Sequence, residues 1–251
     1  MHLVHAALLG ASTLLLLAPS PLRAETSAPC RVDSYENRSL VVCEFDLRHY
    51  DLKLLWKKPD GEVYGSLRNI PHRNQSNGAA LVFATNGGMY RPDLSPVGLY
   101  IEDGRELQRA VTAAGSGNFY WKPNGVFFVR GDSAGILETS RFLQQRPPVD
   151  AATQSGPMLV IGGRIHPRFS SSGRSEKIRN GVGISDTKKV VFAISDDPVT
   201  FTEFAKFFRD QLRCSDALYL DGSISSIYAP SVQRADRLWP LGPMIAVYAR
   251  D

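Results

Sequence analysis

An acid directly follows an apolar run in the segment ALYLDGSISS, residues 217–226. The run has the composition of a buried strand, and Asp221 stands where that strand ends, before Gly222 and a cluster of serines. Partial burial raises the pKa of a carboxyl group and suits it to general acid or base catalysis. The alternative is structural, with Asp221 capping the backbone of Ser223–Ser226. The residue types alone favour neither role.

Other expected strands end in the same way, with glycine beside a polar residue, as in TNGGMY (85–90) and IRNGVG (178–183). Asn-Gly and Asp-Gly pairs are common in turns, so each end taken singly is an ordinary turn. Taken together, the glycines permit close approach of backbone to a ligand, and their neighbours offer hydrogen bonds. We therefore predict one concave site that joins Asp221 and Arg179 to these substrate-binding candidates: Asn86, Gly87, Gly88, Asn124, Gln154, Ser155, Asn180, Gly222 and Ser223.

A second catalytic carboxylate is predicted at Asp196, which follows the apolar run VVFAIS. The sequence contains no GxSxG, GxxxxGK[ST] or HExxH motif, and no CxxC pair. The histidines that follow the first 24 residues, His49, His72 and His166, are widely spaced. We therefore predict no cofactor, although a divalent cation near Asp221 and Asp196 is compatible with the residues present.

Most of the chain is expected to form strands joined by hairpins. Alternating or short apolar runs predict strands at 40–47, 51–57, 81–84 and 244–249. Hairpin turns are predicted where glycine, aspartate or lysine interrupts an apolar pattern: Asp103–Gly104, Gly131–Asp132, Gly162–Gly163 and Asp186–Lys188.

One helix is predicted near 201–213, where Thr200 and Glu203 form a capping box and phenylalanines recur on one face. Those phenylalanines have the spacing of core residues rather than of a ligand platform. Weaker helical turns are expected near 66–70 and 139–146. These elements predict an α+β fold, a single domain of mixed β-sheet with many hairpins and few helices.

The first 24 residues, MHLVHAALLGASTLLLLAPSPLRA, resemble a secretory signal peptide that is cleaved after Ala24. The alternative is an uncleaved membrane anchor, but the apolar run is short for a span and is ended by Pro19 and Pro21. We expect an exported protein, periplasmic or secreted, whose domain covers residues 25–251 and is not inserted in the membrane after cleavage.

Three cysteines are consistent with export. Cys30 and Cys43 flank an alternating segment whose turn is placed at Glu36–Asn37, so the two cysteines face each other in a non-hydrogen-bonded pair. A disulfide between them is predicted, with Cys214 left as a buried thiol. The rival pairing joins Cys43 to Cys214.

The charge balance is mildly basic, with 29 Lys and Arg, 25 Asp and Glu and a formal net charge of +4. The basic residues are scattered, and no nucleic-acid-binding motif is present, so a nucleic-acid partner is not expected. The sequence does not indicate the oligomeric state.

Six ordered blocks resemble the phosphodiester glycosidase family, and among its members the bacterial exported branch. The blocks are NGGMY, SPVGLYIEDGREL, GNFYWKPNGVFFV, ATQSGPMLV, RNGVG and ALYLDGSISSIYAP, and the likeness extends over roughly residues 40–248. The broader family shows a triple-glycine form of the acidic motif and often Arg-Thr in the basic motif, where this chain has LDGSIS and RNGVG.

The resemblance implies a hydrolase that breaks the bond between the anomeric carbon of a sugar and a phosphate oxygen. In that chemistry Arg179 would bind the phosphate in a bidentate manner, and Asp221 would activate water or stabilise an oxocarbenium-like centre. With Asp196 as a partner, the separation of the two carboxylates would decide between retention and inversion. Lys122 is a further candidate.

Two rival interpretations are a non-catalytic periplasmic binder of a glycan or phospho-glycan, and a structural envelope protein whose glycines only form turns. Convergence of the candidate side chains would exclude the second rival. Only turnover separates the enzyme from the binder, because both would keep the pocket.

Overall fold

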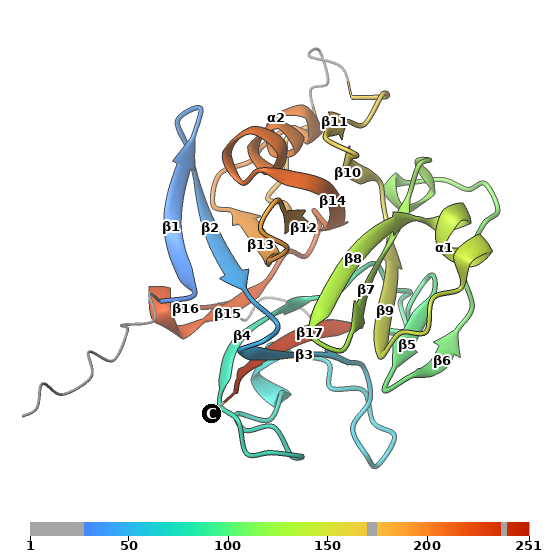
Figure 1. Ribbon diagram of the computed structural model, residues 1–251, viewed down its shortest axis with the longest axis vertical. Helices are drawn as coiled ribbons and strands as arrows, with labels where there is room; N and C mark the ends of the chain where they lie inside the picture. Colours follow the sequence, from blue (N-terminus) through green and yellow to red (C-terminus); the bar gives the residue numbers. More distant parts are fainter. Residues whose placement is uncertain (1–27, 170–174, 237–239, 251) are drawn as a thin grey trace, which may run out of the picture.

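The computed structural model describes residues 28–169, 175–236 and 240–250. Their strands form three sheets, arranged as in Figure 1. The seven-stranded sheet has the order β1 (Cys30–Tyr35), β2 (Arg38–Phe45), β13 (Val190–Ser195), β12 (Asn180–Ser185), β14 (Cys214–Asp221), β10 (Met158–Ile161) and β11 (Arg164–Ile165).

The other two sheets have five strands each. One has the order β16 (Arg234–Ala235), β15 (Ile227–Ala229), β4 (Leu81–Asn86), β17 (Met244–Ala249) and β3 (Tyr50–Leu55). The last has the order β6 (Arg105–Gln108), β5 (Tyr100–Glu102), β9 (Ala151–Ser155), β7 (Gly125–Arg130) and β8 (Ser133–Glu138).

The predicted α+β class with few helices is confirmed. The expected mixed sheet is corrected in one respect, because every strand pairing among the described residues is antiparallel. Short hairpin turns account for several of these pairings, since a tight turn can join only antiparallel neighbours. The four predicted turns all connect paired strands: β5–β6, β7–β8, β10–β11 and β12–β13.

Helical structure is confined to short segments. These are α1 (Thr139–Gln145), α2 (Phe201–Lys206), a π-helical turn (Phe207–Gln211) and 3₁₀ turns at Leu67–Asn69, Asn118–Tyr120 and Pro230–Val232. The predicted capping box is confirmed, because the Thr200 hydroxyl accepts from the Glu203 N–H and the Glu203 carboxylate accepts from the Thr200 N–H. The predicted helix near 201–213 is therefore α-helical only to Lys206, after which it continues as the π-helical turn.

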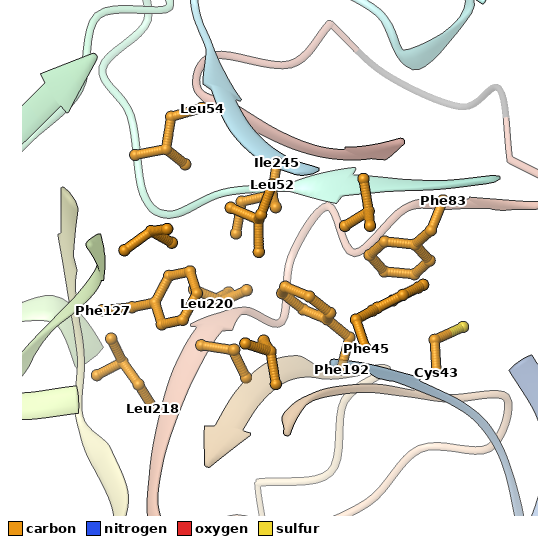
Figure 2. Packing of buried hydrophobic residues seen from close by; sticks show 14 of the residues in the cluster. Cys43, Phe45, Leu52, Leu54, Phe83, Phe127, Phe192, Leu218, Leu220 and Ile245 are labelled. Carbon is orange, nitrogen blue, oxygen red and sulfur yellow. The ribbon is translucent and has the colours of Figure 1, made fainter. Parts of the chain in front are cut away.

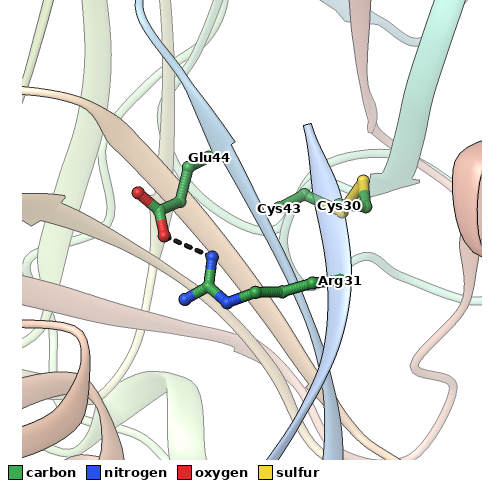
Figure 3. Close-up of a disulfide and its surroundings, with 4 residues drawn as sticks. All are labelled: Cys30, Arg31, Cys43 and Glu44. Atoms are coloured by element: carbon green, nitrogen blue, oxygen red, sulfur yellow. Dashed lines mark hydrogen bonds and ion pairs between the residues drawn. A yellow bond between two sulfur atoms is a disulfide. The ribbon is translucent and has the colours of Figure 1, made fainter. Parts of the chain in front are cut away.

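The β1–β2 hairpin contains the predicted disulfide (Figure 3). Glu36 and Asn37 form the turn with φ values of 47° and 62°, which sets Cys30 opposite Cys43 with their Cα atoms 4.0 Å apart. Cys214 is a buried free thiol, so the rival pairing with Cys43 is wrong.

The main hydrophobic core lies where the three sheets meet, and Figure 2 shows its packing. Phe83, Phe127 and Phe192 come from a different sheet each, and the Phe83 and Phe192 rings stack with centroids 4.9 Å apart. Leu218 and Leu220 of β14 also point into this core. Close packing of these side chains fixes the position of the β14 end that carries Asp221.

The predicted signal peptide, residues 1–24, lies outside the described residues. Within the described ranges, no helix has the length and apolar character needed to cross a bilayer.

Candidate functional site

The ends of four strands meet at the predicted site. β12 and β14 pair antiparallel so that Asn180 faces Asp221. The Asn180 side-chain amide donates to the side-chain oxygen of Asn86, at the end of β4, over 3.0 Å. The Ser155 hydroxyl, at the end of β9, donates to the carbonyl oxygen of Leu220 over 3.3 Å. Residues from far apart in the sequence therefore surround the end of β14.

Asp221 is nearly buried, with 9% of its surface exposed. Its Oδ1 atom accepts from the backbone N–H of Gly222 at 2.6 Å and of Ser223 at 2.8 Å, with a longer contact from Ile224 at 3.5 Å. Among the described residues, no hydrogen bond or ion pair reaches Oδ2. Burial raises the pKa of Asp221, and the backbone hydrogen bonds lower it by less. One oxygen thus caps the loop, while the other makes no such contact.

Arg179 is fully buried, at 0% exposure, and has no acidic partner in the described part of the chain. Its guanidinium donates to the carbonyl oxygens of Val199 and Ser175 and to the Tyr219 hydroxyl, at 2.8, 2.7 and 3.3 Å. It also lies over the Phe201 ring, 3.7 Å from the centroid. Burial lowers the pKa of Arg179, and the neighbouring Tyr219 opposes that change.

Gly222 adjoins both the acid and the guanidinium. A Cβ atom at this position would lie 2.0 Å from the Tyr219 hydroxyl oxygen and 3.3 Å from Arg179 Nη1, so a side chain does not fit there. Asp221 immediately precedes this glycine, and the described residues contain no ion pair between Asp221 and Arg179. Both groups therefore adjoin Gly222, and neither has an ion-pair partner among the described residues.

The predicted amides Asn86 and Asn180 hold the loop that follows Asp221. The Asn86 side-chain oxygen accepts from the Ser226 N–H over 3.0 Å, and the Ser225 hydroxyl donates to Asn180 and to the Asp221 carbonyl. The Asn86 amide nitrogen is buried without a hydrogen-bond partner among the described residues. Both amides therefore position the loop, and neither N–H donor of the Asn86 amide has a partner among the described residues.

Gln154 and Asn124 are buried and bonded to the protein itself. Gln154 Oε1 accepts from the N–H groups of Leu99 and Val111, and its nitrogen donates to the Val111 carbonyl. The Asn124 amide donates to the carbonyl oxygen of Phe119 over 2.9 Å. These contacts fix the segments around residues 99–119. A direct contact of Gln154 or Asn124 with the substrate stays a prediction.

The Gly87–Gly88 pair packs tightly against β9 and β17. Gly88 has a φ of 137°, and a Cβ atom there would lie 2.9 Å from Thr153 Oγ1. The Thr153 hydroxyl in turn donates to the Gly87 carbonyl oxygen over 2.8 Å. The two glycines are thus required for strand packing beside Ser155, and this requirement does not depend on a ligand.

Asp196 lies in a different environment from Asp221. Its carboxylate forms an ion pair with Arg234 and accepts from the Ser39 hydroxyl. It lines a cleft of about 470 Å³ together with Lys177, Gly222–Ser225 and Arg234, whereas neither Asp221 nor Arg179 lines that cleft. The described residues contain no group of three or more acidic, histidine or cysteine side chains that could hold a metal ion.

Sequence reasoning missed the aromatic groups around the two charges. The Tyr219 hydroxyl contacts Arg179 and the Asn118 side chain, and its pKa is raised by burial and by Asp221 but lowered by Arg179. Burial and the nearby Asp221 also raise the pKa of Tyr90 to about 12. Strand alternation offered one signal, because Tyr219 precedes Asp221 by two residues and so shares its face of β14.

Comparison with known proteins identifies the family. The model of the phosphodiester glycosidase family matches residues 79–248, which include every predicted catalytic and substrate-binding residue. The chain belongs to the phosphodiester glycosidase family. A relative from Escherichia coli (strain K12), "Uncharacterized protein YigE", is 38% identical over 196 residues, which cover 78% of this chain and 76% of the relative.

A solved structure shares the fold of this phosphodiester glycosidase family member. It is the zebrafish N-acetylglucosamine-1-phosphodiester alpha-N-acetylglucosaminidase catalytic domain, auto-inhibited by its pro-peptide. The match has a TM-score of 0.57 at 18% identity and covers 88% of this chain and 82% of that chain. At this identity the likeness concerns the fold, and it agrees with the predicted family.

Proposed function

We propose that this protein is an exported hydrolase that releases a sugar from a sugar-1-phosphodiester or a related envelope glycan. The single observation that carries the proposal is that a buried acid and a buried cation, neither with an ion-pair partner among the described residues, both adjoin Gly222. A sugar phosphodiester needs both, because positive charge balances its phosphate and a carboxylate serves its anomeric centre. Membership in the phosphodiester glycosidase family supports the same chemistry.

Asp221 is proposed as the acid or base. Its Oδ1 is held by backbone N–H groups, which fixes the orientation of the carboxylate, and Oδ2 has no partner among the described residues. A raised pKa makes the ionised carboxylate a stronger base. In hydrolysis it would take a proton from water as the oxygen of that water bonds to the anomeric carbon. The bond from that carbon to the phosphate oxygen breaks, and the phosphomonoester leaves with the electron pair.

Arg179 is proposed to balance the phosphate charge. Five N–H groups are present on a guanidinium, and three of those on Arg179 donate to protein oxygens, so one on each terminal nitrogen remains. Because the guanidinium is buried, water screens its charge little, and its attraction for an anion is stronger than at the surface. A phosphate leaving group needs little protonation, so this charge is the main assistance to its departure.

The remaining predicted residues are proposed to form and support the walls of the site. Asn86 has a free donor for a sugar hydroxyl or phosphate oxygen, and the backbone N–H groups of Ser223 and its neighbours hold Asp221. Asp196 is proposed as a residue of the adjacent cleft, where an outer part of a larger glycan would lie. Export is supported by the disulfide and by the sequence of residues 1–24.

The proposal is tested with purified protein lacking residues 1–24 and a panel of sugar-1-phosphodiesters that differ in sugar and anomeric configuration. Release of free sugar together with the phosphomonoester is expected for the wild type and lost in Asp221→Asn. Equal release by both proteins would remove Asp221 from the mechanism. The anomer first formed, followed by NMR, reports whether the reaction retains or inverts configuration.

The non-catalytic binder is the second candidate function, and one observation favours it. Neither Asp221 nor Arg179 lines the adjacent cleft, so a glycan bound there would not meet the two catalytic candidates. A binder would show calorimetric binding of the same phosphodiesters without release of sugar by the wild type.

A further inference from the structure

Trp121 is an exposed aromatic residue with no role in the hydrophobic cores. It is 37% exposed, and the other large hydrophobic residues exposed to this degree within the described ranges are Val32 and Leu107. None of the four core clusters includes Trp121. A single exposed aromatic ring is ordinary on a protein surface, so a role for Trp121 depends on its neighbours.

The position of Trp121 connects it to the candidate site. It directly follows the Asn118–Tyr120 turn, and the Asn118 side chain lies close enough to the Tyr219 hydroxyl to lower its pKa. The Trp121 and Phe201 rings have centroids 5.7 Å apart at an angle of 40°. The same Phe201 ring lies under the Arg179 guanidinium. Trp121 is therefore separated from the buried cation by one aromatic ring.

The order of these groups gives a direction to the site. Phe201 contacts both Tyr219 and Arg179, and Trp121 contacts Phe201. Exposure rises along these contacts, from 0% at Arg179 through 8% at Phe201 to 37% at Trp121. A phosphodiester with its anomeric carbon at Asp221 and its phosphate at Arg179 would extend its second ester group, the aglycone, away from Asp221. Trp121 is the exposed end of these contacts, where an aglycone would pass from the buried cation to the surface.

We propose that Trp121 is a specificity-determining residue that stacks against a ring on the aglycone side of the phosphate. This inference rests on the proposed function. The indole offers a flat apolar face and one N–H donor, which match the C–H face and the hydroxyl edge of a cyclic polyol. Aglycones that present such a face are preferred over small acyclic ones.

The test compares two esters of the same sugar-1-phosphate, one with a methyl aglycone and one with a cyclohexyl aglycone. The wild type is expected to have a lower KM for the cyclohexyl ester. Trp121→Ala raises that KM by roughly tenfold, the loss of one good apolar contact, and leaves the methyl ester within about twofold. Trp121→Phe keeps most of the preference. Leu107→Ala, at another exposed hydrophobic residue, is the matched control and should change neither ester.

The outcomes separate this inference from the proposed function. Turnover of both esters with an unchanged preference in Trp121→Ala overturns the role of Trp121 and leaves the hydrolase intact. If the wild type cleaves neither ester, the hydrolase fails, and the role of Trp121 is measured by tryptophan fluorescence during titration with the cyclohexyl ester. A spectral change that is absent in Trp121→Phe then supports the contact, and the same change in both proteins, or none in the wild type, overturns it.

Discussion

Two strand ends look alike in the sequence and differ in the folded protein. Both β13 and β14 are apolar strands with an aspartate at their end, and both aspartates were predicted to be catalytic. Asp221 is almost buried, is held by backbone N–H groups and has no counter-ion among the described residues. Asp196 is more exposed and is paired with Arg234. Position at a strand end is therefore not sufficient to identify a catalytic carboxylate. Burial and the absence of a counter-ion among the described residues make Asp221 the better candidate acid or base.

The largest expected effect comes from replacing each aspartate in turn. Asp221→Asn should lower kcat/KM by about 10²–10⁴-fold, because it removes a general acid or base. Asp196→Asn breaks an exposed ion pair that contributes about 0–1 kcal/mol, so kcat/KM should stay within a few-fold. Steady-state kinetics on one sugar phosphodiester measures both.

Thermal unfolding of the same two variants provides the control. The asparagine side chain in Asp221→Asn would keep an oxygen acceptor for the loop N–H groups, so this variant should unfold within a few degrees of the wild type. A much lower Tm with proportionate loss of activity would assign Asp221 to loop capping alone. Equal kinetic losses in the two variants would remove the contrast between the strand ends.

The second prediction compares two arginines beside the two aspartates. Arg179→Lys keeps the charge but loses the planar fork and the contact with Phe201, so activity should fall by about 10²-fold. Arg234→Lys should change activity little, because that ion pair is near the surface. The kinetic constants are measured with circular dichroism as a folding control. Loss of activity in the Arg234 variant alone would shift the site to the Asp196 cleft.

The third prediction concerns the disulfide, which joins β1 to β2, the strand that pairs with β13. Replacing Cys30 and Cys43 together by alanine should reduce the free energy of unfolding by about 3 kcal/mol, since the closed loop is short. Urea unfolding measures this loss. The folded variant should keep its kcat, because β4, β12 and β14 hold Asp221; a lower kcat would tie the hairpin to the site.

The smallest expected effect is the pH dependence that Asp221 adds to stability. Burial raises its folded pKa above the ordinary value of 3.8. As the pH rises, Asp221 therefore loses its proton in the unfolded chain before it does so in the folded protein. This difference favours the unfolded state, so the wild type loses stability as the pH rises from 3.8 through the folded pKa. Asp221→Asn has no such proton, so its stability relative to the wild type should rise over that interval. Urea titrations of both proteins between about pH 3 and 8 measure the difference in their free energies of unfolding. A difference that stays constant with pH would contradict this prediction.

The strands, turns and helix caps follow from short-range patterns that the sequence displays. Positive φ at Glu36–Asn37 and the capping box at Thr200 are local properties, and the disulfide follows from the register of one hairpin. The pairing of strands that are distant in the sequence was not predictable. Apolar alternation specifies which face of a strand is buried, but it does not specify which other strand lies beside that strand. The roles of Tyr219 and Trp121 depend on that arrangement.

The sequence by itself determined that Asp221 and Arg179 stand at strand ends next to glycine, since residue type, spacing and apolar runs are local information. Only the tertiary structure decided that Arg179 packs against the glycine next to Asp221 and that Asp196 is paired with Arg234. The physical reason is that burial and ion pairing depend on which segments the packed core brings into contact. Those contacts join residues separated by tens to more than a hundred positions, such as Asn180 with Asn86 and Thr85 with Ser226.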